Sequence, residues 1–223
     1  MVRARQVITN TNPLSPISEQ YRTIRTNLQF AAVDKEIKSF IVTSAEPSDG
    51  KSITAANMAV VYAQQGKTVL LIDADLRKPT IHFTFRVDNV KGLTNYLVRE
   101  RSVQDIITPS RLQNLDLITS GPIPPNPAEL LGSKAMTMFL QEVYGAYDII
   151  IFDTPPVLAV ADAAILGSHV DGALLVAYSK KTKLEAVKQA KERLEQAHTK
   201  ILGSVLNGKE LKKSHYYYYG NDV

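Results

Sequence analysis

The sequence predicts an α/β fold: a parallel sheet with helices on both faces, joined to an N-terminal helix and a flexible C-terminal tail. From residue 39 onward, short apolar runs alternate with longer amphipathic segments, as in a chain that builds strands and helices in turn. The apolar runs are nearly continuous, which is typical of strands buried on both sides. In such sheets ligands bind beyond the carboxyl ends of the strands, so the chemistry is expected there.

Composition indicates one domain. The 223 residues are 44% hydrophobic, enough for a full core, and we expect a domain over residues 1–207 and a tail over residues 208–223. The absence of cysteine excludes disulfides and thiolate metal sites. No apolar run approaches the roughly 20 residues of a membrane-spanning helix, so we expect a cytoplasmic protein. Acidic and basic residues are interspersed and the formal charge is only +4, so no nucleic acid is expected as a partner.

The N-terminal region divides into two parts. Residues 1–14 contain Thr, Asn and Pro without apolar periodicity, which predicts an extended, mobile leader. A Ser-Pro pair at residues 15 and 16 is a helix-start signal, and we expect a helix over residues 15–33. Its apolar face has helical spacing and is made by Ile17, Tyr21, Ile24 and Leu28.

A βαβ unit follows, made by the apolar run Phe40–Thr43, the amphipathic segment Ala55–Gln65 and the run Val69–Ile72. Later apolar runs predict further strands at Leu115–Thr119, Asp148–Phe152, Ala173–Ala177 and Ile201–Leu206. Helix-like stretches separate them, and the clearest covers Leu184–Ala197. Asn207, at the end of the last strand, is either a contact for an adenine base or part of a strand-end turn.

The segment between the first strand and the first helix has the pattern of a P-loop. It reads Ala45-Glu46-Pro47-Ser48-Asp49-Gly50-Lys51-Ser52 and departs from the motif only in its first residue, where alanine replaces glycine. In this pattern the backbone N–H groups and the lysine bind phosphates, and the final hydroxyl ligates Mg²⁺. The pattern predicts a P-loop NTPase-like fold, and the alternative is a turn with Gly-Lys-Ser by chance. The expected nucleotide-binding residues are Ser48, Asp49, Gly50, Lys51, Ser52 and Ile53.

Two predicted strands stop at carboxylates. One is followed by Asp73 and Asp75, and another by Asp153. Because Mg²⁺ takes few carboxylates alongside phosphate oxygens and water, Asp153 and one of the pair suit a metal site with Ser52, and the other suits a proton acceptor. The alternative is that these aspartates cap helices or turns. The cations of Arg77-Lys78 either neutralise a transferring phosphate or pair with nearby acids.

These motifs resemble those of the bacterial tyrosine kinases of capsule and exopolysaccharide biosynthesis, from residue 19 to the C-terminus. In that family the P-loop often begins with a small residue other than glycine, as at Ala45. The segments Leu70–Pro79 and Phe152–Pro156 are similar to its second and third motifs. One departure is Ser48, where the family more often has glycine. The resemblance implies an autophosphorylating protein-tyrosine kinase with ATP and Mg²⁺ as cofactors.

The resemblance also implies roles for individual residues. Lys51 and Ser52 hold phosphate and Mg²⁺, Asp73 is the favoured general base, and Asp75 and Asp153 support the metal. The division between Asp73 and Asp75 is left open. The expected catalytic residues are therefore Lys51, Asp73 and Asp75, and the expected metal ligands are Ser52, Asp75 and Asp153.

A motif in the first predicted helix, Glu19-Gln-Tyr-Arg22-Thr-Ile-Arg25, resembles the family's Glu-x-x-Arg-x-x-Arg oligomerisation motif. At about 100° per residue, its three charged side chains fall on a stripe away from the apolar face, free to meet another subunit. The alternative is a solvated helix face, because exposed charges are common. The resemblance favours a homo-oligomer, arranged as a ring.

Four consecutive tyrosines lie near the C-terminus: Tyr216, Tyr217, Tyr218 and Tyr219. No helix or strand period buries four successive rings on one face, so some are expected to be exposed. By themselves they indicate a sticky edge strand or a partner-binding patch. The resemblance makes them autophosphorylation sites, and the tail after Asn207 has about 30 Å of reach toward a neighbouring active site.

Two further partners are implied by the resemblance: a transmembrane activator or adaptor, which recruits the chain to the cytoplasmic face of the membrane, and a protein-tyrosine phosphatase. Two other functions stay open. A partitioning-type ATPase resembles this fold but normally has a second lysine early in the loop, where Glu46 stands. A nucleotide-gated regulator of polysaccharide export would need the nucleotide site without kinase activity.

Overall fold

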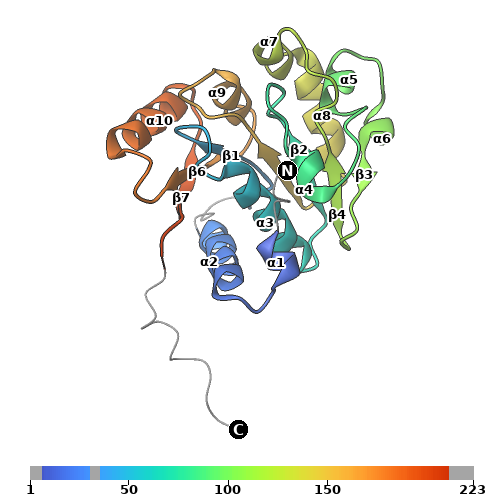
Figure 1. Cartoon of the computed structure of the whole chain (residues 1–223). Coiled ribbons are helices and arrows are strands. Elements are labelled where there is room, and N and C mark those ends of the chain that lie inside the picture. The colour runs from blue at the N-terminus through green and yellow to red at the C-terminus, as the bar shows by residue number, and fades with distance from the viewer. Residues whose placement is uncertain (1–6, 31–35, 211–223) are drawn as a thin grey trace.

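The computed structural model describes residues 7–30 and 36–210, and in them a seven-stranded sheet lies between two layers of helices (Figure 1). The strands are β1 Ser39–Ser44, β2 Val69–Asp73, β3 Thr108–Pro109, β4 Leu115–Ile118, β5 Ile149–Asp153, β6 Ala173–Tyr178 and β7 Ile201–Asn207. The helices are α1 Ile8–Thr11, α2 Pro16–Phe30, α3 Lys51–Ala63, α4 Ile81–Phe85, α5 Leu93–Leu97, α6 Val103–Ile106, α7 Pro127–Leu131, α8 Lys134–Tyr144, α9 Asp162–Gly167 and α10 Leu184–Gln196. The predicted α/β class is therefore confirmed. In the described part of the chain, no helix is long and apolar enough to cross a membrane.

The strand order is β3-β4-β2-β5-β1-β6-β7, and every pair is parallel except β3 with β4. All the strands expected from the sequence are present, and the expected parallel sheet is confirmed, with one short antiparallel strand, β3, at its edge. The antiparallel β3 covers only Thr108–Pro109, and two residues are too few to leave a periodic signal. Because β1 lies between β5 and β6, the loop that follows it is surrounded by the carboxyl ends of other strands.

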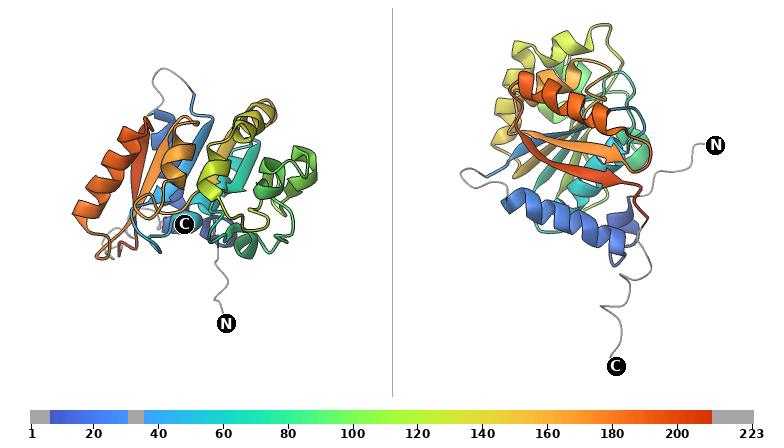
Figure 2. Two further views of the ribbon diagram at one scale, coloured as in Figure 1. Left: turned by 90° about the horizontal axis from the view of Figure 1, so that it is seen from above. Right: turned by 90° about the vertical axis from the view of Figure 1, so that its left-hand side faces the viewer.

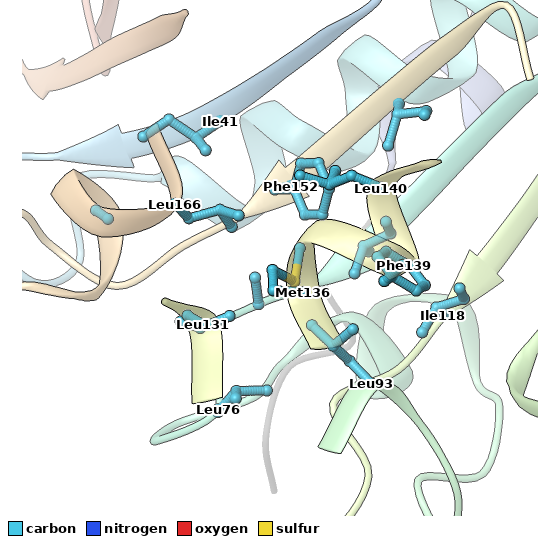
Figure 3. Packing of buried hydrophobic residues seen from close by; sticks show 14 of the residues in the cluster. Ile41, Leu76, Leu93, Ile118, Leu131, Met136, Phe139, Leu140, Phe152 and Leu166 are labelled. Carbon is cyan, nitrogen blue, oxygen red and sulfur yellow. The ribbon is translucent and has the colours of Figure 1, made fainter. Parts of the chain in front are cut away.

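Alternate side chains of the sheet enter two separate cores. On β1, Ile41 packs into the core covered by α8, α9 and α10, whereas Phe40 and Val42 pack into the core covered by α2 and α3. Figure 2 shows α2 and α10 on opposite sides of β6 and β7. In the first core, Phe152 of β5 lies against Met136, Phe139 and Leu140 of α8 (Figure 3). This alternation is what a buried sheet with helices on both faces requires.

The helix that follows the P-loop is enclosed on nearly every side. Twelve of the residues of α3 are buried, including the small Ala55, Ala56 and Ala59. One side of α3 faces the sheet, and α1 and α2 cover the other. A helix that is buried all round carries apolar or small residues all round, which explains its weak amphipathic pattern.

The expectation of an extended leader is wrong for residues 7–14. Residues Ile8–Thr11 form α1, and Thr9 is fully buried against α3. The amide and hydroxyl of Thr9 both donate to Asn57 Oδ1, at 3.0 and 2.9 Å, and Gln64 Nε2 donates to the Thr9 carbonyl at 3.0 Å. These are polar contacts with a distant helix, so apolar periodicity gives no sign of them. Residues 1–6 lie outside the described ranges.

The helix predicted for residues 15–33 is α2, which ends at Phe30 among the described residues. Tyr21 and Leu28 are buried as expected, but Ile17 is 51% exposed and Ser18 takes the buried position beside it. Ser18 Oγ donates to the Asn12 carbonyl at 2.7 Å. The buried face is therefore rotated by about one residue from the apolar stripe, because Ser18 ties α2 to the segment that contains α1.

Replacement of Phe152 by alanine should lower the free energy of unfolding by about 3–5 kcal/mol, because it leaves a cavity in a closed core. The matched control is Phe83→Ala, since Phe83 is 65% exposed and its loss should cost less than about 1 kcal/mol. Chemical denaturation followed by circular dichroism measures both. Equal losses in the two variants would contradict the assignment of Phe152 to the core.

Candidate active site

The three motifs singled out in the sequence meet at one edge of the sheet. In the parallel register, Asp73 of β2 lies opposite Asp153 of β5, and Asp153 lies opposite Val42 of β1. The loop after β1 therefore begins beside the two acidic strand ends. This is the edge where ligands bind in sheets of this kind.

The loop between β1 and α3 has two residues in the left-handed region, Ser48 with φ 64° and Gly50 with φ 96°. A residue with a side chain is disfavoured at Gly50 for two reasons: the positive φ would strain it, and its Cβ would overlap the Asn207 amide. α3 begins at Lys51, directly after this turn. Since the first N–H groups of a helix have no partner within it, the loop and the start of α3 form a site for phosphate.

The lysine of the loop is held between two acids. Lys51 Nζ lies 2.8 Å from Asp75 Oδ2, 3.4 Å from Asp153 Oδ1 and 3.3 Å from Ser52 Oγ, and Lys51 is only 9% exposed. Burial lowers the pKa of Lys51, but the charges of Asp153 and Asp75 outweigh burial and raise it above the ordinary value. Lys51 therefore remains charged and is available to a phosphate that enters the loop.

Asp153 has the properties of a ligand for a cation. It is fully buried, and among the described residues its Oδ2 has no hydrogen-bond partner. Burial raises the pKa of Asp153, and the nearby charge of Lys51 only partly offsets this. A buried carboxylate oxygen without a partner beside the P-loop fits Mg²⁺, which takes few carboxylates when phosphate oxygens and water complete its shell.

The two aspartates after β2 lie in different surroundings. Asp73 is fully buried, and its Oδ2 accepts the backbone N–H groups of Thr80 and Ile81 at 2.8 and 2.9 Å. Burial, followed by the charge of Asp153, raises its pKa. Asp75 instead contacts Lys51 directly. The role of Asp73 as general base stays a prediction, and the geometry favours Asp75 as the acid on the phosphate side.

Arg77 takes the second of its two expected roles, because it pairs with an acid. Its Nε lies 2.9 Å from Asp162 Oδ2 and its Nη2 lies 3.0 Å from Asp162 Oδ1. Asp162 is fully buried at the start of α9. The pair joins the loop after β2 to the segment after β5. Sequence reasoning missed Asp162, since an acid in the first turn of a helix is ordinary.

Asn207 lies beside the P-loop, with its Nδ2 donating to the Asp49 carbonyl at 3.1 Å and to Thr54 Oγ1 at 3.2 Å. Lys181, which sequence reasoning missed, also reaches the loop, and its Nζ lies 3.0 Å from Asp49 Oδ1. It comes from a lysine-rich loop that has no recognisable motif. The remaining expected loop residue, Ile53, is partly exposed in the first turn of α3.

The charged residues of α2 do not form an exposed stripe, because two of them have hydrogen-bond partners outside the helix. Arg25 Nη1 donates to the Val61 carbonyl of α3 at 2.9 Å, so the expectation that Arg25 faces away is wrong. Arg22 pairs with Glu19 and also donates to the Pro13 carbonyl at 2.9 Å. The reason is the rotation of α2, which turns position 25 toward α3. The four tyrosines Tyr216, Tyr217, Tyr218 and Tyr219 lie outside the described residues.

A glycine-containing loop after a buried central strand, a lysine and a serine at the start of the next helix, and two acidic strand ends define a nucleotide-binding protein of the P-loop class. Comparison with known proteins agrees, because residues 37–206 match the family described as AAA domain.

Relatives and solved structures narrow the class. The chain is 57% identical to tyrosine-protein kinase YwqD of Bacillus subtilis (strain 168), over 97% of this chain and 92% of the relative. The kinase domain of Escherichia coli tyrosine kinase ETK superposes with a TM-score of 0.89 at 38% identity, over 97% of this chain and 85% of that one. The chimerical protein CapA2B2 superposes with a TM-score of 0.87 at 42% identity, over 90% and 88%. The chain belongs to the bacterial tyrosine-protein kinase family, and it is an enzyme of that class.

Replacement of Arg77 by methionine should lower the free energy of unfolding by about 2 kcal/mol, because it leaves the buried Asp162 carboxylate without its partner. Asp162→Ala should lower the free energy of unfolding by less than Arg77→Met does, since the Arg77 side chain is 40% exposed and water can solvate its charge. The double variant should be more stable than Arg77→Met alone. Denaturant unfolding of the three variants measures this order, and a double variant less stable than either single one would contradict it.

Proposed function

We propose that the chain transfers the γ-phosphate of ATP to the C-terminal tyrosines Tyr216–Tyr219, from one subunit to the tail of another, and so regulates capsule or exopolysaccharide synthesis or export. The observation that carries the proposal is Lys51, held at the P-loop between Asp75 and Asp153. The membership in a family of tyrosine-protein kinases supports the tyrosine as acceptor.

The proposed nucleotide site uses backbone and side chains of this loop. The N–H groups of the residues from Ser48 to Ile53 bind the phosphates. The positive charge of Lys51 faces the oxygens of the β- and γ-phosphates, between which a bond breaks during transfer. Ser52, Asp75 and Asp153 would hold Mg²⁺, which when bound offsets the negative charge of the phosphates. Most of the rate acceleration then comes from alignment and charge neutralisation, because phosphoryl transfer asks little covalent chemistry of the protein.

The acceptor needs a base. A phenol with a pKa near 10 is a poor nucleophile at neutral pH, so a carboxylate that accepts its proton assists the transfer. Of the two candidates, Asp75 lies closer to the proposed phosphate site, at 2.8 Å from Lys51 Nζ. Asp73 is enclosed by the N–H groups of the loop that it holds. We therefore propose that Asp75, besides helping to hold Mg²⁺, accepts the proton, with Asp73 supporting its loop.

We further propose that the chain forms a homo-oligomer, a ring in which each tail enters the site of the next subunit. Glu19 and Arg22 are the members of the predicted motif that a second subunit could contact, because Arg25 is engaged by α3. As a further partner we propose a transmembrane activator, which the family resemblance implies and which would bring the chain to the cytoplasmic face of the membrane. A protein-tyrosine phosphatase would reverse the modification.

Incubation of the full chain with ATP and Mg²⁺ should produce phosphotyrosine in the tail, and Lys51→Met should reduce its rate by about 100-fold or more. Lys67→Met is the matched control, since Lys67 lies before β2 and its side chain forms a surface pair with Glu36 at 3.4 Å. Mass spectrometry of the tail peptide measures the product. ATP hydrolysis without phosphotyrosine would favour a partitioning-type ATPase, and binding without turnover would favour a nucleotide-gated regulator.

Transfer between subunits predicts that the initial rate of tail phosphorylation per subunit rises with protein concentration. A mixture provides the sharper test, in which Lys51→Met chains with intact tails are combined with active chains whose four tail tyrosines are replaced by phenylalanine. Phosphotyrosine should then appear on the Lys51→Met chains. A rate independent of concentration, with no product in the mixture, would show transfer within one chain.

A further inference from the structure

An ion pair joins the P-loop to the turn that follows β6. Lys181 Nζ donates to the Pro47 carbonyl at 2.6 Å and to Asp49 Oδ1 at 3.0 Å. The other carboxylate oxygen of Asp49 accepts the Glu46 N–H at 3.2 Å. Asp49 is fully buried, whereas the Lys181 side chain is 43% exposed. A carboxylate at such a place depends on its partner, because a buried charge left unpaired is costly.

The loop that carries Lys181 is itself firmly held. The N–H groups of Lys181 and Thr182 donate to the Tyr178 carbonyl at 3.1 and 2.9 Å, and the Tyr178 N–H donates to Thr182 Oγ1 at 2.8 Å. The Ser179 N–H donates to the Asn207 carbonyl at 2.8 Å, which ties this turn to the end of β7. Lys181 is thus presented from a closed turn built on two strands.

Asn207 also contacts the P-loop. Its Nδ2 donates to the Asp49 carbonyl at 3.1 Å, while Lys181 binds the carbonyl of Pro47. The N–H and C=O groups of planar peptides point in opposite directions. Contacts that hold these two carbonyls toward Lys181 and Asn207 therefore favour the opposite direction for the N–H groups of the same peptides, as a phosphate-binding loop requires.

The loop needs such support because its conformation is unfavourable for one of its residues. Ser48 adopts φ 64°, in the left-handed region that residues with a Cβ rarely enter. It lies between Pro47 and Asp49, the two residues that Lys181 contacts. Without these contacts, Ser48 would relax toward other backbone conformations and the nest of N–H groups would be lost.

We propose that Lys181 is a positioning residue for the nucleotide: through Asp49 and the Pro47 carbonyl, it holds the P-loop in the shape that binds phosphate. This role depends on the nucleotide-binding function proposed above. It predicts that Lys181 affects the binding of nucleotide far more than the rate of transfer once the site is saturated.

The test compares two neighbouring lysines in the full chain. Lys181→Met should weaken the binding of ATP by about tenfold, measured by calorimetry with Mg²⁺, and raise the KM for ATP by a similar factor. kcat at saturating ATP should stay close to that of the unmodified chain, whereas the unfolding temperature should fall, because the buried Asp49 carboxylate loses its partner. Lys180→Met is the control, since the Lys180 side chain is 81% exposed and, among the described residues, pairs with the exposed Glu210 at 3.7 Å. Lys181→Arg, which keeps the charge, should restore most of the affinity.

A double-variant cycle shows whether Lys181 acts through Asp49. Asp49→Asn should weaken ATP binding on its own, and Asp49→Asn with Lys181→Met should be no weaker than the worse single variant. The proposal would be overturned if Lys181→Met bound ATP as tightly as the unmodified chain. It would also be overturned if the fold-losses of ATP affinity in the two single variants multiplied in the double variant. A loss of kcat as large as the rise in KM would do the same. If the unmodified chain itself binds no ATP, the proposed function fails instead, so the two failures are distinguishable.

Discussion

The buried charge cluster of Lys51, Asp75 and Asp153 is the constraint on which the rest of the active-site edge depends. A lysine that is 9% exposed stays charged only if acids lie against it, and here they come from the ends of two other strands. The parallel register of β1, β5 and β2 places those ends side by side. A shift of one residue in either pair would turn a carboxylate to the opposite face of the sheet and leave Lys51 without it.

The loops that leave this cluster are held by further polar contacts as well as by the apolar packing of residues such as Leu76 and Val157. Asp73 binds the backbone of Thr80 and Ile81 after β2, and Arg77 joins the same loop to Asp162 at α9. The segments after β2 and β5 are therefore connected away from the phosphate site as well as at it. The two aspartates after β2 thus have different contacts: Asp73 holds the loop, and Asp75 lies beside Lys51.

Helix α3, whose first turn forms part of the proposed phosphate site, is packed on three sides. Its inner side packs on the sheet, α1 and α2 cover its outer side, and Asn207 contacts its first turn at Thr54. Arg25 and Gln64 add hydrogen bonds between the N-terminal segment and the far end of α3. The N-terminal segment from residue 7 is thus packed and hydrogen-bonded against the helix that follows the P-loop.

Local patterns in the sequence determined the α/β class, the longer strands, the P-loop at residues 45–52 and the acidic strand ends at Asp73, Asp75 and Asp153, because each depends on neighbouring residues or on a short period. Only the tertiary structure decided which partner each charge takes. Lys181 meets Asp49 across 132 residues and Arg77 meets Asp162 across 85, and neither acid carries a local signal of its partner.

The same reason explains α1, where Thr9 is buried by hydrogen bonds to Asn57 and not by apolar spacing, and the rotation of α2, which turns Arg25 inward. Periodicity records which face of an element is apolar, whereas pairing between distant polar groups is set by the geometry of the assembled sheet.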